Sequence, residues 1–212
     1  MRKGSLGIFL GVLLFLAATV SAQTTQEDSG MIKTATGVLV ISNEPGNYYT
    51  IHITGKTVKP VPDRPFWFTV DGKFFQIVTA RKSDFLTKGA DKDLDDKAIL
   101  MAHHKWESDY ISETLNRKLK LNTSWQKLAG GMIALAWDYD MPQVADKQTA
   151  MRQLYLAVVK GDRVLAVNTV VEGNDREEDL RALLTNTILT LKPSDKPLSL
   201  KTASEQIKKG SQ

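Results

Sequence analysis

Two histidines and a glutamate form the first group of side chains whose types and spacing could do chemistry. His103 and His104 precede Glu107 by about one helical turn, so on a helix either imidazole could share a metal ion with the carboxylate. His103, His104 and Glu107 are therefore the candidate metal ligands. Ligands from a single turn do not complete a metal site, and the remaining histidine, His52, is an unsupported partner. Packing of the imidazole rings beside the core is the simpler expectation, and we predict no cofactor.

Two carboxylates form the second group. Asp138 and Asp140 are two residues apart, so on a strand both project from the same face. Paired carboxylates can divide the roles of general acid and general base. Acidic residues at a strand end more often meet solvent, here where Met141-Pro142 would end the pairing. The alternative function is therefore an extracytoplasmic hydrolase or metal-dependent enzyme that uses both acids with the histidine pair, in a deep pocket that joins His103 to Asp138.

Aromatic side chains form the third group, because such residues dominate ligand and partner surfaces. The candidate binding residues are Trp67, Trp137 and Tyr139. Core packing is the default for most aromatic residues. In the run Phe66-Trp67-Phe68, strand alternation points Trp67 away from both phenylalanines. At least one large ring of this strand must therefore lie outside the core, either exposed or under a loop.

Other kinds of site are excluded by what the sequence lacks. It contains no cysteine, which rules out disulfides, thiolate zinc sites, iron–sulfur clusters, a cysteine nucleophile and lipid modification of an N-terminal cysteine. The patterns G-x-S-x-G, H-E-x-x-H and G-x-G-x-x-G do not occur. Gly55-Lys56-Thr57 resembles the end of a phosphate-binding loop, but the required upstream glycine is a threonine. We interpret it as a turn.

The N-terminus has the pattern of a secretory signal. Arg2 and Lys3 precede an apolar run over residues 6–16, and Val20-Ser21-Ala22 fits a signal-peptidase site. We predict a signal peptide over residues 1–22 and a secreted or periplasmic protein. The alternative is an uncleaved anchor, because the run extended to Val20 approaches the lower limit for a membrane span. No second run of this kind follows, so no stable span is expected after cleavage.

The net charge of +4 over 212 residues comes mainly from the two ends of the chain. Arg2 and Lys3 belong to the predicted signal, and lysines outnumber acids beyond Leu191. The body of the chain is close to neutral, and its sequence does not show the clustered basic residues and interleaved aromatic residues typical of nucleic-acid binding. We therefore expect an unknown protein or small ligand as the partner, and no nucleic acid.

The turn and helix patterns predict one domain over residues 31–191, between a flexible lead over 23–30 and a flexible basic tail over 192–212. Turn residues indicate four hairpins, and apolar periodicity predicts one helix within 93–116 and another after Asn174. Strands apolar on both faces must be covered on both faces. The predicted fold is α+β, with a curved, mainly antiparallel sheet built from hairpins and covered by helices on both faces. The hairpins pair residues 38–42 with 48–54, 66–70 with 74–80, 118–128 with 132–140, and 154–159 with 163–171.

The second half of the chain resembles the PsbP-like and DcrB-like superfamily. The resemblance covers residues 118–191 and is carried by WQKLAGG leading into MIALAW (residues 125–137), by LYLAVVKGDRVLAV (residues 154–167) and by the closing helix. It implies an extracytoplasmic, usually non-catalytic accessory or binding domain with no shared active site. Many DcrB-like proteins are lipoproteins, whereas this chain has no cysteine to modify. We therefore expect a non-catalytic accessory protein that binds a protein or a small ligand.

Overall fold

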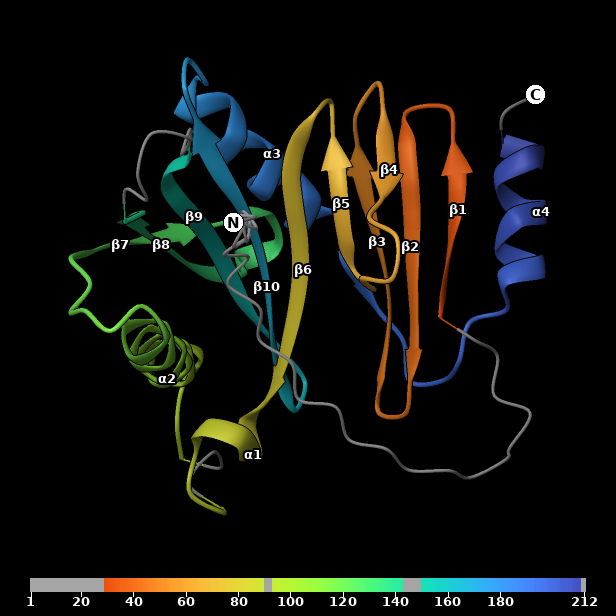
Figure 1. Ribbon diagram of the computed structural model, residues 1–212. Helices are drawn as coiled ribbons and strands as arrows, with labels where there is room; N and C mark the ends of the chain where they lie inside the picture. The colour runs from red at the N-terminus through yellow and green to blue at the C-terminus, as the bar shows by residue number, and fades with distance from the viewer. Residues whose placement is uncertain (1–28, 90–92, 143–149, 211–212) are drawn as a thin grey trace, which may run out of the picture.

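The computed structural model describes residues 29–89, 93–142 and 150–210. Within these ranges the chain forms a four-stranded sheet, a seven-stranded sheet and four α-helices (Figure 1). The strand orders are β1-β2-β3-β11 and β4-β5-β6-β10-β9-β8-β7. The strands are β1 (Gly30–Thr34), β2 (Gly37–Glu44), β3 (Asn47–Thr54), β4 (Val58–Pro60), β5 (Trp67–Val70), β6 (Lys73–Arg81), β7 (Leu121–Lys127), β8 (Ile133–Asp140), β9 (Ala150–Lys160), β10 (Arg163–Glu172) and β11 (Lys192–Pro193). The helices are α1 (Lys82–Phe85), α2 (Asp96–Thr114), α3 (Glu177–Leu189) and α4 (Leu200–Gly210).

The four predicted hairpins are present. β2 pairs with β3, β5 with β6, β7 with β8 and β9 with β10, each as antiparallel neighbours. In the β5–β6 turn Asp71 and Gly72 have φ angles of 51° and 84°, and a tight two-residue hairpin turn favours positive φ at both positions. β1 and β4 each add one strand to a hairpin and have no counterpart among the predicted elements.

Strands β9 and β10 are covered on both faces, as their apolar sequences predict. Leu154 and Leu156 of β9 lie in one core cluster with Leu184 of α3. Tyr155 points the other way and lies in a second cluster with Leu100 of α2. The two helices therefore pack on opposite faces of the seven-stranded sheet. The mixed α+β class with large antiparallel sheets is confirmed.

The strands form two sheets, whereas the sequence predicted one. The β2–β3 hairpin is flanked by β1 on one side and by β11 on the other, so its pairing does not continue to β4 or β5. The inner face of this hairpin packs against the first core cluster: Val40 and Ile51 lie together with Phe75 of β6 and Ile188 of α3. This apolar cluster, which includes α3, packs the two sheets together without a shared strand ladder.

Both predicted helices are present, but α3 begins later than predicted. α2 falls within residues 93–116. The helix predicted after Asn174 begins at Glu177, and the residue before its first turn is Arg176. Asp175 accepts a hydrogen bond from a backbone N–H at the end of β10 and forms an ion pair with Lys73. These contacts hold Asn174 and Asp175 in the turn that precedes the helix.

Residues 192–210, expected to be a flexible extension, contain a strand and a helix instead. β11 pairs with β3, and α4 packs against β1. The side chain of Asn43 on β2 binds this segment through two hydrogen bonds, which we call the Asn43 clamp. Its Nδ2 donates to the Leu198 carbonyl at 2.9 Å, and its Oδ1 accepts from the Leu198 N–H at 2.8 Å.

The docked tail lies over the outer face of the four-stranded sheet. Val40 faces the core, so its neighbours Leu39 and Ile41 face outward. Ile41 nevertheless has 0% exposure. The tail contains few apolar residues, and they pack against the outward-facing apolar surface of the sheet. The apolar residues of α4 recur at spacings of three and four: Leu200, Ala203 and Ile207.

The predicted signal peptide and most of the predicted lead over 23–30 lie outside the described residues. Among the residues that are described, no helix combines the length and the apolar character needed to cross a membrane.

The Asn43 clamp provides a test of tail docking. Asn43→Ala removes both hydrogen bonds to Leu198, and we expect the free energy of unfolding to fall by about 2 kcal/mol in urea titrations. Trypsin should also cut faster after Lys201. Asn174→Ala, in an exposed turn, should change stability by less than about 0.5 kcal/mol. Equal cleavage of the wild-type and Asn43→Ala chains would show that the clamp does not hold the tail.

Candidate functional site

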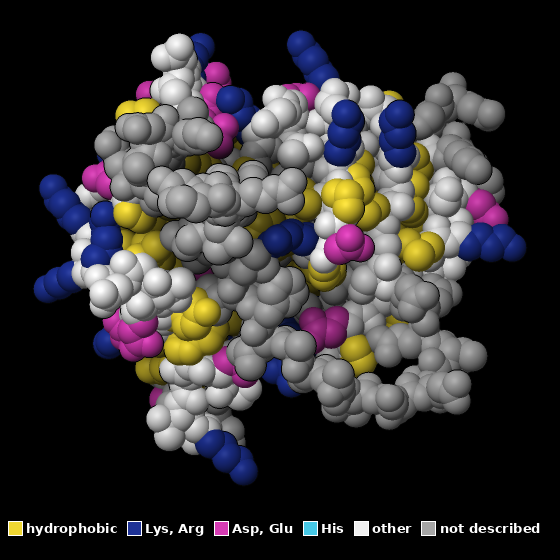
Figure 2. Space-filling view, viewed as in Figure 1, with side chains coloured by type: hydrophobic (Ala, Val, Ile, Leu, Met, Phe, Trp, Pro, Cys, Tyr) yellow, Lys and Arg dark blue, Asp and Glu magenta, His cyan; other side chains and the backbone are white. Residues whose placement is uncertain are grey.

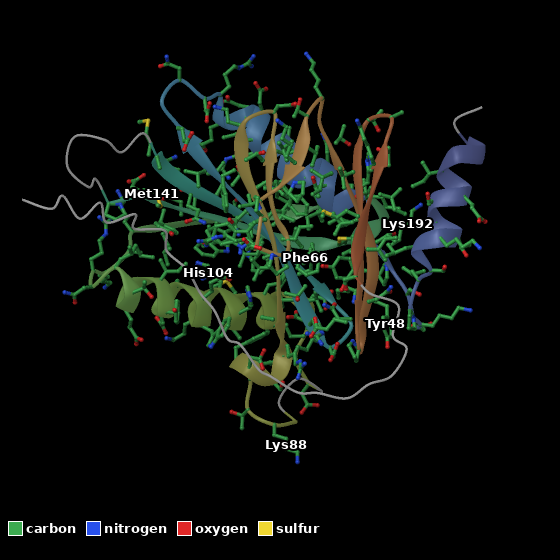
Figure 3. All side chains as sticks on the ribbon, turned by 45° about the vertical axis from the view of Figure 1, so that its right-hand side comes forward. Tyr48, Phe66, Lys88, His104, Met141 and Lys192 are labelled. Carbon is green, nitrogen blue, oxygen red and sulfur yellow. The ribbon has the colours of Figure 1, made fainter. Side chains whose placement is uncertain are left out.

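The predicted metal ligands are buried between α2 and the seven-stranded sheet. His103 is 1% exposed, and its Nε2 lies 3.3 Å from Oε2 of Glu107. The ring of His103 contacts Phe85 and Trp106. His104 packs edge-on against another ring, that of Trp137, so the two imidazoles have different surroundings. His104 is labelled beside α2 in Figure 3. The described part of the chain contains no group of three or more His, Asp or Glu residues arranged to hold a metal ion.

Burial shifts the pKa values of Glu107 and His103 toward their neutral forms. Desolvation raises the pKa of Glu107 to about 7. Desolvation, with a smaller contribution from the neighbouring His104, lowers the pKa of His103 to about 4. Within the described residues, Nδ1 of His103 and Oε2 of Glu107 have no hydrogen-bond partner. Burial removes the water that would solvate either ion, so the neutral forms are favoured.

Asp138 serves as a structural link between the seven-stranded sheet and α3. Arg181 of α3 donates to its Oδ2 at 2.6 Å, and Asn122 of β7 donates to its Oδ1 at 2.8 Å. Glu177 accepts hydrogen bonds from both Arg152 and Arg181, which extends the network. Asp138 is 4% exposed, so this charge has exchanged water for fixed hydrogen-bond donors.

The alternative enzyme site is not assembled in the structure. Asp138 points to the α3 face of β8, where it meets Arg181. His104 contacts Trp137, the next residue on β8, which points to the opposite face. His103 belongs to the same helix as His104, so the sheet itself separates the histidines from Asp138. Asp140 shares the face of Asp138 but pairs with Arg152 at 3.1 Å. The expectation that these acids and histidines form one catalytic pocket is corrected.

Two of the three candidate binding aromatics belong to the core. Trp137 and Tyr139 are each 1% exposed, and Trp137 stacks on Tyr155 with the ring centroids 3.8 Å apart. Their proposed role in a binding surface is therefore wrong. Trp67 is half-buried on the opposite side of β5 from the buried Phe68, as strand alternation predicts. The guanidinium of Arg64 covers its ring at 5.0 Å.

A groove lies between α4 and the outer face of the four-stranded sheet, and we call it the outer groove. Its volume is ≈ 860 Å³. In Figure 3 the sheet is seen edge-on and α4 stands beside it, with Lys192 labelled between them. The floor and walls come from segments far apart in the chain: Leu39, Thr50 and His52 from the sheet, Leu189, Thr190, Lys192, Pro193 and Ser194 near the end of α3, and Leu198, Ser199, Thr202, Ala203 and Ile207 from the tail.

The sequence did not predict this groove. Its position depends on the docking of the tail, which the sequence indicates only through the apolar spacing in α4. His52 lies in its floor, with its Nε2 2.8 Å from the Thr34 hydroxyl and its Nδ1 3.3 Å from that of Thr54. Burial lowers the pKa of His52, which favours the neutral imidazole. Among the described residues that line the groove, Lys192 alone carries a formal charge.

Charged side chains elsewhere on the surface are of mixed sign. Figure 2 shows basic and acidic side chains interspersed around apolar patches over the described part of one face. This distribution agrees with the nearly neutral body of the sequence.

No family model matches the chain, and no curated protein matches it. Among solved structures, the solution structure of cyanobacterial PsbP from Synechocystis sp. PCC 6803 is similar at 9% sequence identity and a TM-score of 0.43, over 82% of this chain and 98% of that chain. At this identity and TM-score the likeness shows neither a shared family nor a shared function.

The buried Glu107 predicts a pH-dependent stability. The ordinary pKa of this carboxyl is 4.5, and its pKa in the folded chain is about 7. At a pH between these two values, the unfolded chain has released a proton that the folded chain still retains. The free energy of unfolding attributable to this group therefore falls as pH rises through that range. Glu107→Gln cannot titrate, so between about pH 5 and pH 8 it should gain stability relative to the wild type, on the order of 3 kcal/mol.

Urea unfolding of both proteins at the two pH values gives this difference. His103 is present in both chains and contributes in the opposite direction, a loss of stability as pH falls below about 6.5. Glu113→Gln, on the exposed side of the same helix, is the matched control and should show a constant difference from the wild type. A constant difference for Glu107→Gln as well would contradict the prediction.

Proposed function

We propose that this chain is a non-catalytic accessory protein that acts outside the cytoplasm and binds a small ligand in the outer groove. The groove is the observation that carries this proposal. Its volume of ≈ 860 Å³ lies within the range of about 300–1,000 Å³ that is common for small-molecule sites. Its lining combines aliphatic side chains with a few polar groups, as such sites do. This size and concave shape favour a small ligand over a protein surface.

The arrangement of the polar side chains supports a binding role over catalysis. Asp138 and Arg181 hold α3 to the sheet. His103 and Glu107 lie on the buried side of α2 and do not line the outer groove. The side chains that the sequence offers for acid–base or metal chemistry therefore have structural roles. The outer groove is lined by residues suited to contact with a ligand.

The location outside the cytoplasm is supported by the sequence. Residues 1–22 have the charge, apolar run and small residues of a secretory signal, and the PsbP-like and DcrB-like resemblance implies an extracytoplasmic domain. We expect the protein from a fractionated cell to begin at Gln23 when its N-terminus is measured by mass spectrometry. An intact Met1 would contradict cleavage of a signal.

Binding in the outer groove can be measured with 1-anilinonaphthalene-8-sulfonate, an apolar anion whose fluorescence rises in apolar sites. The wild-type chain should bind this probe, and Ala203→Trp should weaken the binding by at least about tenfold, because the new ring occupies the groove. Glu205→Trp, which adds the same ring to the exposed side of α4, should bind as the wild type does. No binding by the wild type, or equal binding by both variants, would contradict the proposal.

A further inference from the structure

The apolar part of the outer groove is aliphatic. Leu39 lies in its floor, and Leu189, Leu198, Ala203 and Ile207 lie around it. Among the described residues that line the groove there is no Phe, Tyr or Trp. Leu189 is 43% exposed, which is high for a leucine at the end of a packed helix. A surface of this kind fits a flexible hydrocarbon chain, and it offers no aromatic platform for a planar ring or a base.

Most of the polar groups in the groove already have partners within the protein. Both ring nitrogens of His52 contact threonine hydroxyls. The Thr190 hydroxyl bonds to the backbone of Thr187 and of His52. The hydroxyls of Ser194 and Ser199 bond to backbone groups of their own segment. A ligand rich in hydroxyl or amide groups would find few free partners here and would lose hydrogen bonds to water, which disfavours sugars and peptides.

Lys192 sets the charge that the groove favours. It is the one formally charged residue of the lining, and no Asp or Glu lines the groove within the described residues. Lys192 is itself exposed, at the side of the groove between the sheet and α4 (Figure 3). An anionic group placed at this edge would stay hydrated while the rest of the ligand contacts the leucines.

From these three observations we propose that the ligand is a single-chain amphiphile, an aliphatic chain that ends in one anionic group. A free fatty acid has this chemistry. The chain lies along Leu39, Leu189 and Ile207, and the head group lies beside Lys192. This inference rests on the proposed binding function of the outer groove and adds the class of ligand.

Isothermal titration calorimetry with the full chain tests the class of ligand. Hexanoate, octanoate and decanoate, each below its micelle concentration, should bind with an affinity that rises about threefold to fourfold per added methylene. Decanol should bind about twofold to fivefold more weakly than decanoate, because an exposed ion pair contributes little. Lys192→Gln should remove this preference. Lys201→Gln, which removes the same charge from a residue outside the lining, should retain it.

Two outcomes would overturn the ligand class. An affinity independent of chain length would exclude an aliphatic chain, and equal affinity of decanoate and decanol for the wild type would exclude an anionic head group. Leu189→Asn, at an already exposed position, should weaken decanoate without unfolding the chain and so supplements Ala203→Trp. Sedimentation of the protein with phosphatidylglycerol vesicles, without binding of free decanoate, would assign the groove to a membrane surface instead.

The fluorescent probe separates failure of this inference from failure of the proposed function. If the probe binds in a manner sensitive to Ala203→Trp and decanoate does not displace it, the groove binds ligands of another class. If neither the probe nor decanoate binds, the binding function itself is wrong.

Discussion

The need to cover both faces of β9 and β10 determines the arrangement of the whole molecule. Each strand is apolar at successive positions, so neither face can be left in water. α2 covers one face and α3 the other. α3 in turn contacts the inner face of the four-stranded sheet and so joins the second sheet to the first. The outer face of that second sheet is then left over, and the tail covers it.

This constraint also explains the fate of the candidate catalytic residues. On β8, Trp137 and Asp138 are neighbours in sequence, yet one lies beneath α2 and the other meets Arg181 of α3. A seven-stranded sheet with a helix on each face places alternate side chains in separate cores. Residues that look like one catalytic group along the sequence therefore become two unrelated structural groups. The buried His103 and Glu107 are tolerated because burial favours their neutral forms.

The parts of the fold that could be predicted from the sequence are those that depend on neighbouring residues. The Asp71-Gly72 turn and the apolar period of α3 carry their own signals within a few residues. The contact between Asn43 and Leu198 joins positions 155 residues apart, and no local sequence pattern predicts it. The existence of two sheets and the docking of α4 depend on such contacts. The outer groove was missed for the same reason, because its floor and its walls belong to distant segments.

The groove and the tail are coupled by their geometry. α4 has 11 residues, and helices shorter than about 12–15 residues are marginal in water unless tertiary contacts support them. Its contacts run to β1, while Ala203 and Ile207 border the groove and not a filled core. A ligand that contacts both these residues and Leu39 adds the apolar surface that the helix lacks on this side. Ligand binding and docking of α4 must then stabilise each other, since the ligand binds only the docked arrangement.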